Sequence, residues 1–141
     1  MDLTQLKIVS KRHVFEHPEY PGFRVDLNYL PRKEWEALQK QSEKKVWVKG
    51  SPRFEMDKDF FYPELAARIF NGWSGINGHI LSKLIPVEWD DEKLKDEEIE
   101  FSKKAAGVLM RNSAEFDEWI TSVVSELQMF EDGQIKEAEK K

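Results

Sequence analysis

Residues 23–29 carry the most restrictive pattern in this sequence, a strict alternation of apolar and polar side chains. The apolar positions are Phe23, Val25, Leu27 and Tyr29. A period of two places all four on one face of a β-strand. The alternation therefore predicts a strand with one apolar face, and the fold has to include a sheet.

The residues just before this strand predict its partner. Residues 13–17 read as a second strand, and the connection over residues 18–22 contains Pro18, Pro21 and Gly22, which suit a hairpin loop. We therefore expect an antiparallel hairpin near the amino terminus.

The three histidines are the candidate metal ligands of this sequence. His13 and His17 are four residues apart, so an extended backbone would separate them by about 13 Å on the same face of the strand. That distance is too long for one shared metal ion, and we expect both to be surface residues. His79 follows a glycine and is expected to lie in a loop.

A helix and a short strand are predicted next. Pro31 is preorganised for the first position of a helix that runs to about Lys44. Residues 46–48 are expected to add a short strand. The Gly-Ser-Pro sequence at residues 50–52 then breaks the chain.

A stronger helix is predicted after this break. Asp57 or Asp59 can cap it, and Pro63 lies in its first turn. Its main apolar residues recur at every fourth position: Phe61, Leu65, Ile69 and Trp73. We expect this helix to end in the glycine-containing stretch of residues 72–78, because glycine reaches the left-handed conformation that closes helices.

Two further helices are predicted after an acidic connector over residues 88–100. Ser102 can cap the first helix, and Ser113 can cap the second. The apolar residues of the second helix follow steps of four, three, four and three residues, which keeps them on one side: Phe116, Ile120, Val123, Leu127 and Phe130.

Together these elements predict a single α+β domain over residues 1–130. We expect it to be predominantly helical, with an N-terminal antiparallel β-hairpin packed on about four helices. Its centre is expected to include one set of large apolar residues: Phe61, Leu65, Ile69, Trp73, Leu109, Phe116, Ile120 and Val123. Residues 131–141 are polar and are expected to form a disordered tail.

Composition narrows the class of function. The chain has no cysteine, so it cannot form a disulfide, a thiolate nucleophile or a cysteine-based zinc site. It also lacks a secretory leader pattern and any stretch of about 20 apolar residues. We therefore expect a cytoplasmic protein without a membrane partner. The net charge is −5, from 22 basic and 27 acidic residues that are interleaved, so nucleic acid is not expected as the main partner.

The sequence contains no recognised catalytic motif. It lacks a Gly-x-Ser-x-Gly elbow, a phosphate-binding loop and a dinucleotide fingerprint. Helix caps and a solvated loop explain the carboxylate pairs Asp57 with Asp59 and Asp90 with Asp91. We therefore name no catalytic, cofactor-binding or metal residue and expect a non-enzymatic protein that binds other proteins. Two alternatives stay open, an enzyme with a site built from scattered carboxylates and a nucleic-acid-associated regulator.

The order of the landmarks resembles that of the tail assembly chaperones of long-tailed bacteriophages and related prophages. The resemblance covers most of residues 12–130. Its landmarks are His17-Pro18 before the hairpin turn, the alternating strand leading into a proline-started helix, Trp73-Ser74-Gly75-Ile76, the stretch of residues 101–112, and residues 116–120. The acidic connector departs from the family, in which a short turn with Asp-Gly precedes the second half. Taken singly, Trp73 with Gly75 can be a core anchor and a helix stop.

The resemblance implies a protein of the host cell cytoplasm that is absent from the mature virion. Its partners would be the tape measure protein, which it keeps soluble, and the tail tube protein, whose assembly it assists. Association of the chain with itself as a homo-oligomer stays open. The resemblance also implies a second, longer product of programmed frameshifting, with the lysine codons of Lys140 and Lys141 as the expected slippery run.

Overall fold

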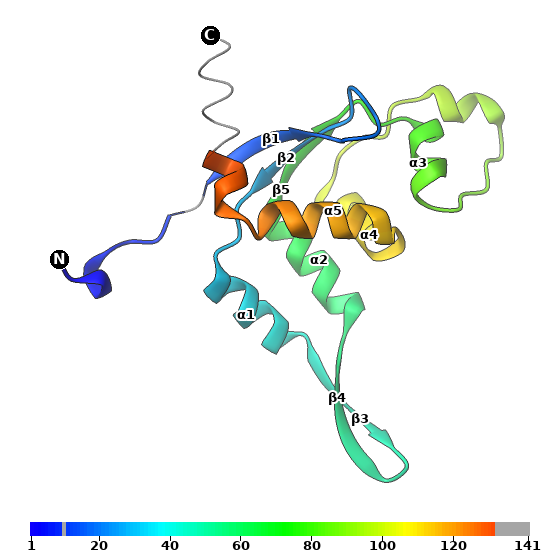
Figure 1. Ribbon diagram of the computed structural model, residues 1–141. Coiled ribbons are helices and arrows are strands. Elements are labelled where there is room, and N and C mark those ends of the chain that lie inside the picture. The colour runs from blue at the N-terminus through cyan, green and yellow to red at the C-terminus, as the bar shows by residue number, and fades with distance from the viewer. Residues whose placement is uncertain (10, 132–141) are drawn as a thin grey trace.

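The computed structural model describes residues 1–9 and 11–131, and its fold is α+β, the class that the sequence predicts. Its elements in chain order are η1 (Leu3–Gln5), β1 (Arg12–Glu16), β2 (Arg24–Asn28), α1 (Arg32–Gln41), β3 (Glu43–Val48), β4 (Ser51–Met56), α2 (Lys58–Ile69), β5 (Phe70–Ser74), α3 (Gly78–Leu84), η2 (Glu92–Asp96), α4 (Lys103–Asn112) and α5 (Ala114–Val124). A three-stranded antiparallel sheet has the order β1-β2-β5, and β3 and β4 form a separate two-stranded ribbon (Figure 1).

The hairpin predicted near the amino terminus is confirmed. β1 and β2 pair antiparallel, with Phe15 opposite Val25. A backbone hydrogen bond of 2.8 Å from the amide of His17 to the carbonyl oxygen of Phe23 closes the loop. The alternating residues form the predicted apolar face of the strand, since Phe23, Val25 and Leu27 are fully buried.

The helix predicted through Trp73 is wrong beyond Ile69. α2 ends there, and the next five residues form β5, which pairs with the free edge of β2. Asn71 and Gly72 are poor helix formers, and the edge of β2 offers backbone hydrogen bonds to β5, in which Gly72 pairs with Asp26. Pairing at the sheet edge therefore outweighs the four-residue spacing that linked Trp73 to the helix.

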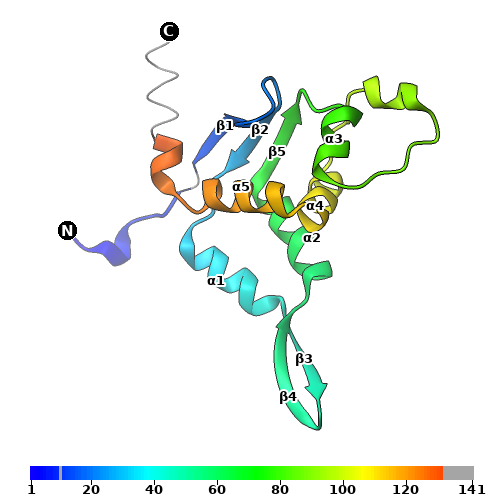
Figure 2. The same ribbon diagram turned by 45° about the vertical axis from the view of Figure 1, so that its right-hand side comes forward.

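The core lies between this sheet and α2, α4 and α5, which Figures 1 and 2 show beside it. Seven of the eight residues predicted at its centre are buried, and Trp73 is partly buried. The rings of Phe23 and Phe70 stack on Phe116, with centroid distances of 6.2 and 6.0 Å. These three rings connect the sheet to α5.

Both predicted serine caps are confirmed. The Oγ of Ser102 accepts a hydrogen bond from the amide of Ala105, and the Oγ of Ser113 accepts one from the amide of Phe116. α4 packs closely along α2, where a Cβ added at Gly107 would lie 3.3 Å from the Cα of Pro63. The missing side chain at position 107 therefore allows the two helices to approach.

The single helix predicted over residues 116–130 is interrupted. α5 ends at Val124, whose carbonyl oxygen accepts a hydrogen bond of 3.2 Å from the amide of Leu30. A separate helical segment follows over residues 127–131 and leaves Leu127 46% exposed. A tertiary contact at the end of α5 therefore takes the place of the next helical turn.

The tail predicted over residues 131–141 lies outside the described residues except for Glu131. The Oε1 of Glu131 forms an ion pair of 3.1 Å with the Nζ of Lys11. This pair connects the end of the helical segment to the residue that precedes β1.

His17 is buried, which corrects the expectation that both N-terminal histidines lie at the surface. It is 3% exposed, and its ring stacks on Phe23 at 5.7 Å and contacts Trp119 at 4.6 Å between centroids. Its Nδ1 accepts a hydrogen bond of 3.1 Å from the amide of Glu19, whereas its Nε2 has no hydrogen-bond partner among the described residues. Burial lowers the pKa of this imidazole, because it penalises the charged form.

Candidate protein-binding surface

β3 and β4 form a ribbon that projects from the rest of the molecule, called the arm below (residues 43–56; Figures 1 and 2). Its turn residues Lys49 and Gly50 have φ of 51° and 79°, as a two-residue type I′ hairpin turn requires. At its base, the amide of Asp57 donates a hydrogen bond of 2.6 Å to the carbonyl oxygen of Ser42. The arm is therefore an insertion whose two ends meet between α1 and α2.

The sequence predicts only part of the arm. The strand expected at residues 46–48 is confirmed as the end of β3, but β4 is missed because Pro52 reads as a break. In a two-stranded ribbon each strand has one edge without a partner, and proline is tolerated on such an edge. The signal that could have indicated β4 is the Lys49-Gly50 pair, because residues with positive φ join the strands of tight hairpins.

One face of the arm is aromatic and open to solvent. Cross-strand pairing places Trp47 opposite Pro52 and Lys45 opposite Phe54, and the alternation of a strand puts all four on the same face. Trp47 is 65% exposed and Phe54 is 71% exposed. The Nζ of Lys45 lies 4.8 Å from the centroid of the Trp47 ring.

The arm is basic although the chain is acidic. Its four basic residues are Lys44, Lys45, Lys49 and Arg53, and its acidic residues are Glu43 and Glu55. These charges give the arm a net charge of +2 on a chain of net charge −5. Lys45 lies on the aromatic face and Lys49 in the turn beside it, whereas Lys44 and Arg53 lie on the opposite face. Lys45 and Lys49 would attract a partner with carboxylates beside its apolar residues.

The arm has the features of an element that is completed by a partner. A two-stranded ribbon on its own is marginally stable in water. Every residue of β3 and β4 except Val46 is exposed. Covering the rings of Trp47 and Phe54 would stabilise a complex by about 1.5–3 kcal/mol for each ring fully buried. The exposed aromatic face is therefore the candidate site of the molecule.

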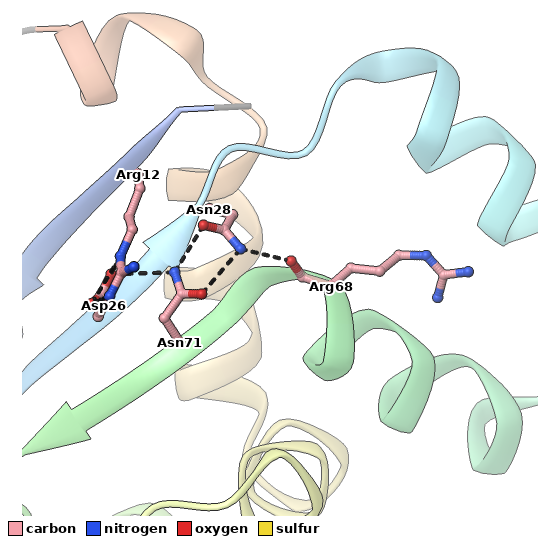
Figure 3. A network of polar contacts seen from close by, with 5 residues as sticks. All are labelled: Arg12, Asp26, Asn28, Arg68 and Asn71. Carbon is pink, nitrogen blue, oxygen red and sulfur yellow. Dashed lines mark hydrogen bonds and ion pairs between the residues drawn. The ribbon is translucent and has the colours of Figure 1, made fainter. Parts of the chain in front are cut away.

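A polar network lies on the face of the three-stranded sheet that points away from the core (Figure 3). The NH2 group of Arg12 lies 2.6 Å from the Oδ2 of Asp26. The Nδ2 of Asn71 donates hydrogen bonds to Asp26 (3.3 Å) and to Asn28 (2.8 Å). The Nδ2 of Asn28 donates in turn to the carbonyl oxygen of Arg68 (3.0 Å). These groups satisfy one another, so the network holds β5 and the end of α2 against β2 and serves the fold.

The carboxylate pairs of the sequence do not form a metal site among the described residues. Asp57 precedes α2, but its side chain makes no capping hydrogen bond, which corrects that expectation. Asp91 instead caps η2, where its Oδ1 accepts a hydrogen bond of 3.0 Å from the amide of Lys93. Within residues 1–9 and 11–131, no group of three or more histidine, aspartate or glutamate side chains is arranged to hold a metal ion.

His79 also departs from its prediction. It lies in the first turn of α3 and not in a loop, and its Nε2 is 2.7 Å from the Oδ1 of Asp96. Both side chains are more than half exposed. The pair therefore links α3 to η2 at the surface.

The comparisons with known proteins add no family to this description. The chain matches no family model, no curated protein and no solved structure. In the part of the chain that the structure describes, no helix has the length and apolar character needed to span a membrane.

Proposed function

We propose that this protein binds other proteins without catalysing a reaction, as a tail assembly chaperone that keeps a phage tape measure protein soluble in the host cell cytoplasm. The observation that carries the proposal is the aromatic face of the arm, with Trp47 and Phe54 exposed. The resemblance in sequence supplies the identity of the partner. The arm supplies a surface that suits an apolar helical stripe.

The length of the aromatic face suits such a partner. A strand of six residues extends over about 20 Å, which is the length of about 13 residues of α-helix. A tape measure protein is expected to be long, helical and apolar along one stripe, so it would aggregate before the tail tube encloses it. A few turns of that stripe would cover Trp47 and Phe54. A contact of this size is small enough to be displaced when tail tube subunits arrive.

Co-purification tests this proposal. The chain is co-expressed with the tape measure and tail tube proteins encoded in the same genome, and mass spectrometry identifies the proteins that co-purify. Trp47→Ala combined with Phe54→Ala should lower recovery of the tape measure protein by about tenfold or more, because both central rings are lost. Val46→Ala, on the opposite face, is the matched control and should have little effect. Failure of the wild-type chain to recover a tape measure protein would refute the proposal.

The basic residues of the arm favour one alternative, binding of single-stranded nucleic acid. Exposed rings such as Trp47 and Phe54 can stack on bases while lysine and arginine contact phosphates. The acidic residues in the arm and the net charge of −5 weigh against this alternative. Fluorescence anisotropy with a labelled strand of about 20 nucleotides, at salt concentrations of about 50 and 200 mM, tests it. Salt-sensitive binding that Lys45→Glu abolishes would favour nucleic acid over a tape measure protein, because Lys45 lies on the aromatic face.

A further inference from the structure

A groove runs along the exposed side of α4. One hollow of about 420 Å³ lies between α2 and α4, and a second hollow of about 210 Å³ lies between α4, β5 and α3. Lys104 and Val108 line both hollows, so the two lie next to each other along α4. We call this surface the α4 groove.

The floor of the α4 groove is apolar. In the first hollow it is formed by Pro63, Gly107 and Val108, and Val108 is 50% exposed. Gly107 is buried and lies against Pro63, so α4 and α2 are close together at the bottom of this hollow. The second hollow is lined mainly by aliphatic and aromatic residues, among them Trp73 and Ile99.

The rim of the first hollow is strongly basic. Four cationic residues line it against one carboxylate: Lys58, Lys103, Lys104 and Arg111 against Asp59. The Nζ of Lys103 donates to the carbonyl oxygen of Ala67 (2.9 Å), and the Nε of Arg111 lies 3.7 Å from the Oδ1 of Asp59. Among the described residues, Lys58 and Lys104 form no ion pair. The chain has a net charge of −5, but the rim of this hollow is positive and its floor is apolar. The hollow therefore suits a ligand with negative charges beside apolar groups.

We propose that the α4 groove binds an acidic amphipathic helix of a second protein. Lys104, Val108 and Arg111 are spaced by four and three residues, so they lie along one side of α4. A partner helix would place its apolar stripe on Val108 and its flanking carboxylates on Lys104 and Arg111. The arm of another copy is basic and would be repelled from this rim. This site does not depend on the proposed function of the arm.

Binding of two designed peptides to the full chain tests the proposal. Both peptides carry leucine at helical spacing, one with glutamate and the other with lysine at the flanking positions. Fluorescence anisotropy should show binding of the glutamate peptide and little binding of the lysine peptide, with weaker binding at high salt. Lys104→Glu combined with Arg111→Glu should weaken binding of the glutamate peptide by about tenfold or more. The arm variant Trp47→Ala with Phe54→Ala should leave this binding unchanged, which separates the two sites.

Controls make the outcome decisive. Circular dichroism and thermal melting should show that the charge-reversed variant is folded, because Lys104 and Arg111 are exposed. If that variant does not fold, Lys104→Gln replaces it, and this variant should still weaken binding of the glutamate peptide. Equal binding of both peptides, or no effect of the variants, would overturn the proposal. If the chain bound neither peptide but bound a DNA duplex tightly through Lys104 and Arg111, the proposal would also be overturned, in favour of a phosphate-binding surface.

Discussion

The backbone of Gly75 lies against the backbone of Gly22, so closely that a Cβ at position 75 would overlap the carbonyl oxygen of Gly22. Gly75 also has a φ of 75°, in the left-handed region. This contact joins the turn that follows β5 to the loop between β1 and β2. The end of the three-stranded sheet can therefore close only because residue 75 has no side chain.

Gly75→Ala should destabilise the fold by roughly 2–4 kcal/mol, from backbone strain together with the steric overlap. Urea denaturation of the variant measures this free energy. Gly22→Ala is the matched control, because Gly22 has a φ of 90° but a Cβ there would contact nothing within 4 Å. A loss at Gly75 no larger than the loss at Gly22 would mean that the close contact is absent.

The parts of the fold that follow from local pattern are those that the sequence predicts. The alternation from Phe23 to Leu27 fixes a buried strand face, and Ser102 and Ser113 cap their helices, because these signals depend on neighbouring residues alone. The four-residue spacing predicts Trp73 on a helix, but Trp73 lies in β5, which pairs with the edge of β2, a segment distant in sequence. The spacing of apolar residues along the chain does not indicate pairing between strands that are distant in sequence.

The same limit applies to the candidate site. Trp47 lies in a strand that the sequence predicts, but Phe54 lies in one that it does not. Only the pairing of β3 with β4 shows that the two residues share a face. The α4 groove likewise arises from residues of four separate segments, so no single motif could indicate it.

The hydrogen bond between Tyr62 and Asp117 connects α2 to α5, and its removal should cost about 1–2 kcal/mol. The Oη of Tyr62 donates to the Oδ2 of Asp117 at 2.7 Å. Tyr62→Phe removes this bond and keeps the ring, and thermal denaturation at neutral pH measures the loss. Tyr20→Phe is the control, since the hydroxyl of Tyr20 has no hydrogen-bond partner among the described residues. Equal stability of Tyr62→Phe and wild type would contradict the prediction.

The same tyrosine should make the protein sensitive to alkaline pH. Burial and the hydrogen bond to Asp117 raise the pKa of Tyr62 to about 12, from a usual value of about 10. The folded state therefore holds this proton more tightly than the unfolded state. The resulting stabilisation is complete below pH of about 10 and is lost as the pH rises towards about 12. Across this pH range, the free energy of unfolding should fall more steeply for the wild type than for Tyr62→Phe.

Protonation of His17 should weaken the fold in mild acid. Its pKa is lowered mainly by burial, although the nearby charges of Glu115 and Glu19 act in the opposite direction. The unfolded state therefore binds a proton more readily than the folded state. Stability is full above the unfolded pKa of about 6.5 and falls as the pH decreases below it, by at most about 1.4 kcal/mol per pH unit. Thermal melting between pH of about 7.5 and 5.5 measures this slope.

His17→Asn provides the control for that slope. Asparagine does not titrate, and its Oδ1 is an acceptor attached to Cγ, as Nδ1 is, so it can replace Nδ1 as the partner of the Glu19 amide. The variant should melt at a temperature that changes less over the same pH range. A slope equal to that of the wild type would assign the acid sensitivity to other groups.

Deletion of the arm should separate folding from binding. The amide of Asp57 and the carbonyl oxygen of Ser42 are hydrogen-bonded at 2.6 Å, so a short glycine linker can replace residues 43–56. The arm contributes no fully buried residue to the core, and the shortened chain should retain its stability to within about 1 kcal/mol. Recovery of the tape measure protein should be lost, whereas binding of the glutamate peptide by the α4 groove should persist. Unfolding of the shortened chain would show that the arm stabilises the domain, and retained recovery of the tape measure protein would place its binding site elsewhere.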